Sequence, residues 1–171
     1  MSPEPSISHA ERSWDGSTEL YFVETRSEEQ RLLLCQWAEH FYEKGYRVYI
    51  LTDSTTASQH IDQLLWTFSE LSFVPHRVYS GEEPQEIEDP VVIGAGERFL
   101  EGFGVLLCDA PVGLDFICRF PLVVHFVILD DENQRQFSRA LYRDARQRRL
   151  GVYHIPYSSN HPTTSSKTEA I

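Results

Sequence analysis

The apolar residues of this chain fall into two recurring patterns, short runs and longer segments with helical spacing. The runs have the length and the β-branched or aromatic content of strands. They cover residues 19–24, 47–52, 90–93, 104–109, 122–129 and 152–155. The later runs are continuously apolar, as expected of strands in a sheet covered on both faces. Segments whose apolar residues have helical spacing follow the runs at 19–24, 47–52 and 122–129. The pattern predicts a three-layer α/β domain with an open, mostly parallel sheet and helices on both faces.

Polar residues next to these helical segments indicate where each helix begins. Ser27 precedes two glutamates and a glutamine, which is typical of an N-cap with a capping box. Asp53 or Ser54 is expected to cap the second helix, and Asp130 or Asp131 the last one. The last helix is expected to run for about 18 residues, up to a glycine that precedes the closing strand.

The length of 171 residues fits a single domain. Hydrophobic residues make up 41% and aromatic residues 12% of the chain, which excludes a wholly disordered protein. Residues 1–18 and 156–171 are rich in Ser, Thr and Pro and lack periodicity. We therefore expect disordered tails on either side of a domain that spans residues 19–155.

Cysteine usage and hydropathy indicate where the protein resides. Cys35, Cys108 and Cys118 are an odd number of thiols among apolar neighbours, which is typical of reduced cysteines in a cytoplasm. The chain has no run of about 18 apolar residues that could span a membrane. Its first residues have neither the basic flank nor the apolar centre of a signal peptide. We expect a cytoplasmic protein without a membrane partner.

Charge is unevenly distributed along the chain. The 15 basic and 26 acidic residues give a net charge of −11, which argues against a general nucleic-acid binder. Residues 134–149, however, contain six arginines and one aspartate. This segment carries +5, so the rest of the chain carries −16. A basic island on an acidic protein favours one localised anionic partner.

The last predicted helix carries these arginines as a stripe beside its apolar face. Arg135, Arg139, Tyr142, Arg146 and Arg149 follow at spacings of four, three, four and three. They could form a solvated surface that offsets the surplus carboxylates. They could instead line a groove for an acidic peptide, with arginines binding carboxylates and the tyrosine flanking an apolar anchor. A track for nucleic-acid phosphates is a third interpretation, which the acidity of the rest of the chain disfavours.

Aromatic residues also gather where the second helix ends. Trp66, Phe68 and Phe73 fall in a segment expected to be helix end and loop. Because loops lie on surfaces, these side chains either close the edge of the core or form a protein-binding patch.

The remaining sequence patterns give little support for nucleotide or metal binding. Gly94 and Gly96 follow an apolar run, as in half of a dinucleotide-binding fingerprint, but Phe99 stands where the third glycine belongs. A plain strand-to-loop turn is the favoured interpretation. None of the seven histidines has the spacing of a metal site, and His125 is expected to be a hydrogen-bonded residue of the core. We expect no metal, no cofactor and no catalytic residue.

The segment Leu64-Leu65-Trp66-Thr67-Phe68, together with Ser72-Phe73-Val74-Pro75-His76, resembles the chi subunit family of bacterial DNA polymerase III. The resemblance covers residues 19–155. It implies a Rossmann-like fold and a non-enzymatic accessory subunit of the clamp loader. It also implies two partners in DNA replication, the psi subunit and the acidic, Phe-ending C-terminal tail of single-stranded DNA-binding protein. DNA would be contacted only indirectly.

The resemblance also implies roles for individual residues. Trp66 and Phe73, with Phe68 beside them, match the surface that contacts psi or, in some family members, a DNA helicase. A second set falls where the family holds the acidic tail: Val127, Arg135, Arg139 and Tyr142, with Arg146 as a further carboxylate partner. The alternative from another class is a small Rossmann-like nucleotide-binding enzyme that uses Gly94 and Gly96.

Overall fold

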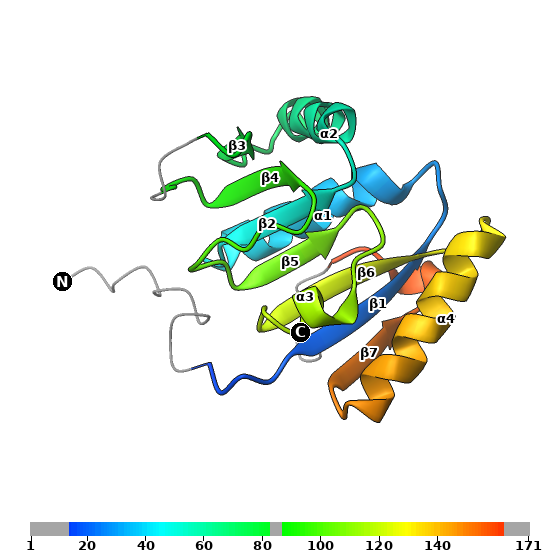
Figure 1. The fold of residues 1–171 in the computed structure, drawn as a ribbon. Coiled ribbons are helices and arrows are strands. Elements are labelled where there is room, and N and C mark those ends of the chain that lie inside the picture. The colour runs from blue at the N-terminus through cyan, green and yellow to red at the C-terminus, as the bar shows by residue number, and fades with distance from the viewer. Residues whose placement is uncertain (1–13, 83–86, 163–171) are drawn as a thin grey trace.

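The computed structural model describes residues 14–82 and 87–162, and in this part of the chain the strands form one parallel sheet (Figure 1). The strands are β1 (Glu19–Thr25), β2 (Val48–Thr52), β3 (His76–Tyr79), β4 (Val91–Ala95), β5 (Val105–Cys108), β6 (Leu122–Ile128) and β7 (Gly151–Ile155). Their order is β3-β4-β2-β5-β6-β1-β7, and every pairing between them is parallel. The predicted α/β class is confirmed, and the sheet is wholly parallel.

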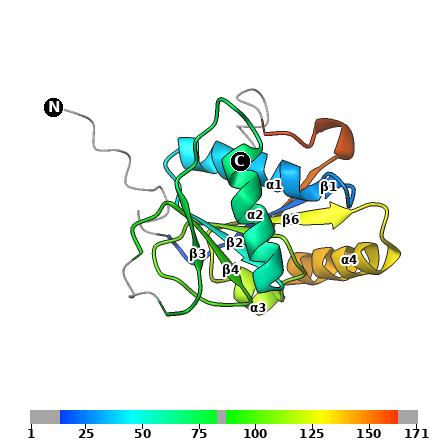
Figure 2. The same cartoon turned by 90° about the horizontal axis from the view of Figure 1, so that it is seen from above.

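Helices cover both faces of this sheet (Figure 2). On one face lie α1 (Gln30–Glu43) and α2 (Thr55–Thr67), and on the other lie the short α3 (Leu114–Ile117) and α4 (Glu132–Gln147). Each face has its own apolar cluster, since alternate residues of one strand point to opposite faces. Leu106 and Leu107 of β5, for example, belong to different clusters. The central strands are therefore buried on both sides, which explains their continuous apolar runs.

The predicted capping residues are correct for α2 and α4 and wrong for α1. The side chain of Ser54 accepts a hydrogen bond from the backbone N–H of α2, and Asp131 does the same for α4. The prediction that Ser27 caps the first helix is wrong. Its backbone N–H and its hydroxyl both donate to the Asp130 carboxylate, at 2.9 and 3.0 Å, and α1 begins at Gln30 without a side-chain cap. The competing carboxylate comes from a distant part of the chain, which local sequence cannot reveal.

Packing continues beyond both expected domain boundaries. Thr18 is buried and donates through its hydroxyl to the carbonyl of Phe120 at 2.8 Å. After β7, residues Tyr157–Ser159 form a 3₁₀ helix, η2, and Asn160 is buried. The expected disorder of residues 1–13 and 163–171 lies outside the described residues. No helix in the described ranges is both long enough and apolar enough to cross a membrane.

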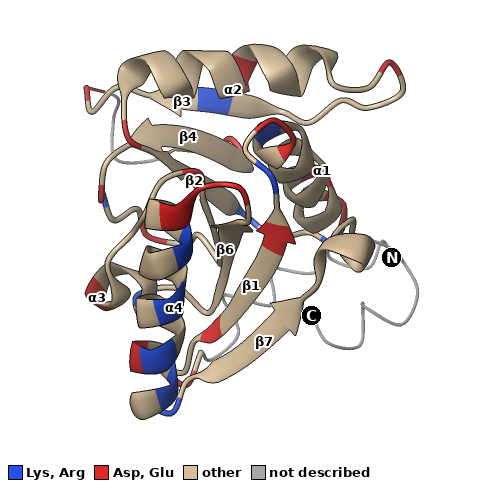
Figure 3. Cartoon of the chain, turned by 90° about the vertical axis from the view of Figure 1, so that its right-hand side faces the viewer, with Lys and Arg blue, Asp and Glu red and all other residues tan. Residues whose placement is uncertain are grey.

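Strand register brings three distant segments together under α4. β1 lies between β6 and β7, so Glu24 pairs with Val127, while Phe22 pairs with His125 on one side and His154 on the other. α4 connects β6 to β7 and packs across these strands (Figure 3). The carboxyl-terminal halves of β1, β6 and β7 therefore form a floor beneath one helix.

Candidate functional site

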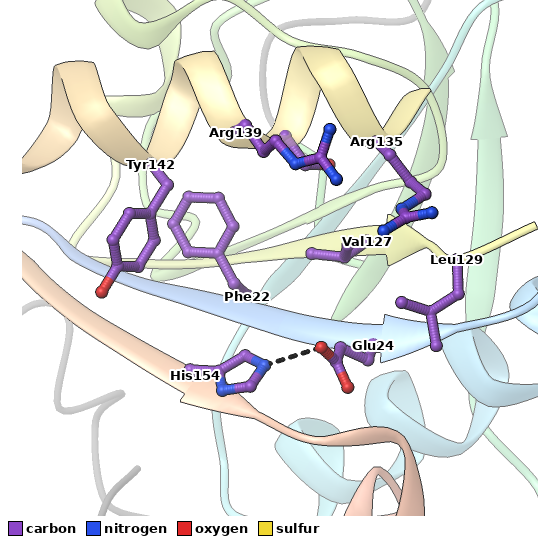
Figure 4. Close-up of a pocket in the computed structure, with 9 residues that line it drawn as sticks. Phe22, Glu24, Val127, Leu129, Arg135, Arg139, Tyr142 and His154 are labelled. Atoms are coloured by element: carbon purple, nitrogen blue, oxygen red, sulfur yellow. Dashed lines mark hydrogen bonds and ion pairs between the residues drawn. The ribbon is translucent and has the colours of Figure 1, made fainter. Parts of the chain in front are cut away.

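A groove of about 400 Å³ lies between α4 and the three strands beneath it (Figure 4). We call it the α4 groove. Its lining residues come from β1, β6, α4 and β7 and from the residue after β6: Phe22, Glu24, Val127, Leu129, Arg135, Ser138, Arg139, Tyr142 and His154. Val127, Arg135, Arg139 and Tyr142, which sequence analysis placed at one site, are thus lining residues of a single groove.

The floor of the α4 groove is apolar. Phe22, Val127 and Leu129 line it from two neighbouring strands and the residue that follows one of them. The ring of Tyr142 packs edge-on against Phe22, with ring centroids 5.2 Å apart, and remains 37% exposed. An exposed ring beside an apolar floor suits a bulky apolar side chain of a ligand.

The rim of the α4 groove on the helix side is basic. Arg135 and Arg139 line the groove, and their side chains are 40% and 61% exposed. Both approach the exposed carboxylate of Glu132, at 3.7 and 3.6 Å. Such exposed pairs contribute little to stability, so the guanidinium groups can exchange this partner for a ligand carboxylate at small cost. The helix side can therefore bind an anion.

Arg146 lies next to the α4 groove and is not one of its lining residues. Its Nη1 is 3.4 Å from the Tyr142 hydroxyl, and its guanidinium carbon is 5.9 Å from the centre of that ring. It thus flanks the aromatic residue on the side away from Arg135 and Arg139, one turn further along α4.

A buried histidine supports the groove from below. The Nε2 atom of His125 is 2.8 Å from the Ser138 hydroxyl, and its ring packs against Phe22. Burial lowers the pKa of His125 to about 4, so the ring is neutral at physiological pH. The sequence prediction of a hydrogen-bonded core histidine is confirmed.

The wall opposite α4 is polar. The Glu24 carboxylate is 2.9 Å from His154 Nε2 and also accepts the backbone N–H of Tyr157 at 3.0 Å. The sequence patterns did not predict Phe22, Glu24 and His154 as groove residues. Phe22 and Glu24 are two residues apart in β1 and share one face of the strand, so the sequence pattern could have placed them together. Only the pairing of β7 with β1 brings His154 beside them.

The second candidate surface lies where α2 ends. Trp66 and Phe73 are 54% and 65% exposed, and their ring centroids are 5.8 Å apart. Leu71, which lies between them in the sequence, is fully exposed and was not predicted to belong to this surface. We call Trp66 and Phe73 the aromatic patch. Phe68 differs, because it is half-buried and packs against the core.

The glycines considered for nucleotide binding have a packing explanation. A Cβ atom on Gly94 would lie 2.6 Å from the Tyr49 hydroxyl, and that hydroxyl donates to the Gly96 carbonyl at 3.0 Å. Gly96 has a φ of +88°, which favours glycine in a turn. Among the described residues, no cluster of His, Cys, Asp and Glu could hold a metal ion. The thiols of Cys35 and Cys108 are buried, which raises their pKa values.

Three curated relatives match most of the chain. The DNA polymerase III subunit chi of Escherichia coli K12 is 28% identical over 67% of this chain and 76% of its own length. Those of Haemophilus influenzae Rd and Pseudomonas aeruginosa PAO1 are 29% and 25% identical, over 67% and 75% of this chain. The latter two alignments cover 78% and 88% of the relatives.

Solved structures resemble this chain in fold alone. Dbp5 of S. cerevisiae, solved bound to RNA and ADP BeF3, aligns with a TM-score of 0.63 at 12% identity. T4 UvsW aligns with a TM-score of 0.57 at 9% identity. These alignments cover 92% and 82% of this chain, which spans less than half of either structure, 44% and 41%.

The model of the family described as DNA polymerase III chi subunit, HolC, matches residues 18–152, nearly the whole α/β domain. With the fold described above and the three relatives, this match confirms the resemblance read from the sequence. The chain belongs to the chi subunit family of DNA polymerase III.

Proposed function

We propose that this chain is a non-catalytic adaptor in DNA replication that binds the acidic, Phe-ending C-terminal tail of single-stranded DNA-binding protein in the α4 groove. The observation that carries the proposal is the combination of an apolar floor with two exposed arginines on one rim. The terminal Phe would occupy the apolar floor beside Val127 and Tyr142. Carboxylates of the tail would bind Arg135 and Arg139, with Arg146 as an outer partner.

The charge distribution supports an acidic ligand despite the net charge of −11. At cellular ionic strength charges are screened beyond about 8 Å, so the field within the groove is set by its own lining, where Arg135 and Arg139 outnumber Glu24. Carboxylates outside the groove act at longer range and slow the approach of an anionic partner. Affinity is therefore expected to be modest and to fall as salt is added.

The direct test is fluorescence anisotropy with a labelled peptide that has the C-terminal sequence of the host's single-stranded DNA-binding protein. A control peptide lacks the final Phe. We expect micromolar binding that weakens with salt and is lost with the control peptide. Affinity independent of both salt and the final Phe would contradict the proposed site.

A pair of variants tests the placement. Arg139→Ala removes a groove-lining guanidinium, and Arg143→Ala removes a similarly exposed one that does not line the groove. We expect about tenfold weaker peptide binding for Arg139→Ala, because a charge-assisted contact is lost. This loss of affinity is smaller than for a buried contact because solvent screens the exposed guanidinium. Arg143→Ala should change affinity by less than twofold.

We further propose that the aromatic patch docks the psi subunit of the clamp loader or, in its place, a DNA helicase. Large exposed aromatic side chains are unusual on a surface without a partner, and Trp and Phe are frequent anchors of protein interfaces. The adaptor would bridge this partner to single-stranded DNA-binding protein without a reaction of its own. A thermal-shift screen with nucleotides tests the enzymatic alternative, for which a bound nucleotide would raise the unfolding temperature.

A further inference from the structure

β7 is a sheet edge without the residues that usually keep an edge strand from pairing with another chain. It pairs with β1 on one side only and is the last strand in the order (Figure 1). Its five residues, Gly151–Ile155, include no charged residue and no proline. The opposite edge strand, β3, has four residues, directly follows Pro75 and carries Arg77, which pairs with Asp89 at 2.7 Å. Short length, charge and proline are common means of blocking an edge, so β7 is the edge open to pairing.

The side chains of β7 suit pairing with an identical strand. In a dimer with a twofold axis perpendicular to the sheet, the two edge strands run antiparallel, and the central residue lies opposite its own copy. That residue is Tyr153, which is 37% exposed and whose ring stacks on Tyr21 with centroids 4.7 Å apart. Aromatic residues directly opposite each other on neighbouring strands stabilise a sheet. On the other face, Val152 would lie opposite His154 of the second copy, so no like charges meet along the strand.

The carboxyl end of this edge is acidic. Glu24 lies there beside His154, with its Oε2 atom 2.9 Å from the Nε2 atom of the histidine. α4 begins at the same end of the sheet with Asp131 and Glu132 (Figure 3). A second copy therefore meets carboxylates where β7 ends.

The amino end of the same edge is basic. The end of α4 and the two residues after it hold four arginines, of which two pair with aspartates at 3.7 and 2.8 Å. The other two, Arg146 and Arg149, are exposed and pair with no carboxylate in the described part of the chain. Antiparallel pairing brings the basic end of each copy level with the acidic end of the other, whereas parallel pairing brings like ends together. Charge therefore favours the antiparallel arrangement.

We propose that this chain associates with a second copy of itself by antiparallel pairing of β7, centred on Tyr153, which joins the two sheets into one. This inference does not depend on the ligand proposed for the α4 groove. Because rotation about an axis perpendicular to the sheet keeps each face on its own side, both α4 helices lie on one face of the joined sheet. The two β3 strands, with the aromatic patches near them, lie at its far edges. The paired strands are short, so the dimer is weak and reversible.

Sedimentation velocity of the full chain, from micromolar to hundreds of micromolar, is the first test. We expect the mass of the wild-type protein to rise with concentration from 19.8 kDa toward twice that value. Tyr153→Lys places like charges directly opposite each other and should stay monomeric throughout. The control is Leu32→Lys, which adds the same charge at an exposed apolar residue of α1 and should associate as the wild type does. Circular dichroism confirms that each variant is folded.

Disulfide formation tests the register. Residues directly opposite each other in an antiparallel pair have Cα atoms about 4.5–5.5 Å apart, within the range of a disulfide. Tyr153→Cys should therefore form a disulfide-linked dimer on mild oxidation. Val152→Cys lies diagonal to its own copy, at about 7–8 Å, and should form it at least tenfold more slowly. Both variants also carry Cys118→Ser, since the other two cysteines are buried, and each rate is normalised to the reaction of the thiol with a small disulfide reagent.

A wild-type protein that stays monomeric at hundreds of micromolar overturns the inference, as does association that Tyr153→Lys leaves unchanged. Equal normalised rates for the two cysteine variants would mean random collision and would overturn the pairing of β7 as well.

Discussion

Tyr49 determines the glycine pattern that resembles a nucleotide-binding fingerprint. Its ring packs beneath β4 so closely that a methyl group at Gly94 would overlap its hydroxyl. The same hydroxyl anchors the turn by donating to the Gly96 carbonyl. A G-x-G sequence after a strand can therefore arise from the packing of a neighbouring aromatic residue, without any ligand.

Replacing Gly94 by Ala should destabilise the protein by about 1–3 kcal/mol, because the added methyl forces the buried Tyr49 ring to move. The control is Gly113→Ala. Gly113 has a φ of −70°, and its nearest neighbour would be an ordinary 3.6 Å from the new Cβ. Urea unfolding measures both variants, and equal stability of the two would refute the packing explanation.

His125 should make stability depend on pH. Burial lowers its pKa from 6.5 to about 4, so below pH 6.5 the unfolded chain binds a proton that the folded protein does not. This contribution to stability is complete above pH 6.5 and is lost as the pH falls toward 4. Between pH 8 and pH 5 the loss is about 2 kcal/mol.

The difference between wild type and His125→Gln isolates this effect, because all other titrating groups are shared. Urea unfolding at several pH values should show a steeper loss of stability below pH 6.5 for the wild type. Parallel curves would mean that His125 titrates normally in the folded state. His40, whose pKa burial also lowers to about 4, contributes equally to both proteins.

At the scale of elements, the segment after β7 holds the end of β1 to α1. The Trp37 indole donates to the Asn160 carbonyl at 2.9 Å, and the Asn160 amide donates to the Glu24 carbonyl at 2.9 Å. The first contact is buried and the second is part-buried, and both join residues more than 120 positions apart in sequence. η2 and Asn160 therefore belong to the folded domain.

Ending the chain after Ile155 should destabilise the domain by about 2 kcal/mol or more, since the buried Trp37 indole loses its partner and Glu24 loses two donors. A chain that ends after residue 162 keeps these contacts and serves as the control. Thermal unfolding of the two proteins distinguishes them. The shorter chain should also bind the acidic peptide with altered affinity, because Glu24 lines the groove.

At the scale of the molecule, the sheet order separates the two candidate surfaces. β3, next to the aromatic patch, and β7, next to the α4 groove, are the opposite edges of the sheet. α2 and α4 also cover opposite faces (Figure 2). Partners at the two proposed surfaces would therefore approach the molecule from different sides, as the proposed adaptor role requires.

Variants at the two surfaces should consequently behave independently. Phe73→Ala should abolish copurification with psi and leave peptide affinity unchanged, because the side chain is 65% exposed and contributes little to the core. Arg139→Ala should have the opposite effects. Leu32→Ala, at an exposed apolar residue of α1, is the matched control and should affect neither. Loss of both interactions by either single variant would contradict separate surfaces.

The strands and helices that were predicted have strong local patterns of apolar residues. The two elements that were not predicted, β3 and α3, lack such patterns. The interior strands are continuous apolar runs, whereas β3 has four residues of mixed polarity at the edge of the sheet. α3 is a single turn between strands. Arg135, Arg139 and Tyr142 were identified as a set because they share one helix face. Glu24 and His154 were not, because they meet only through strand pairing.

The sequence by itself determined the class of the fold, the amphipathic α4 with its arginines, and the family, because each depends on periodicity or on short-range motifs. Only the tertiary structure decided which strands lie beneath α4, that a carboxylate faces the arginines, and that Asp130 rather than α1 binds Ser27. These features arise from contacts between residues far apart in sequence. Strand order and register create such contacts, and no local pattern encodes them.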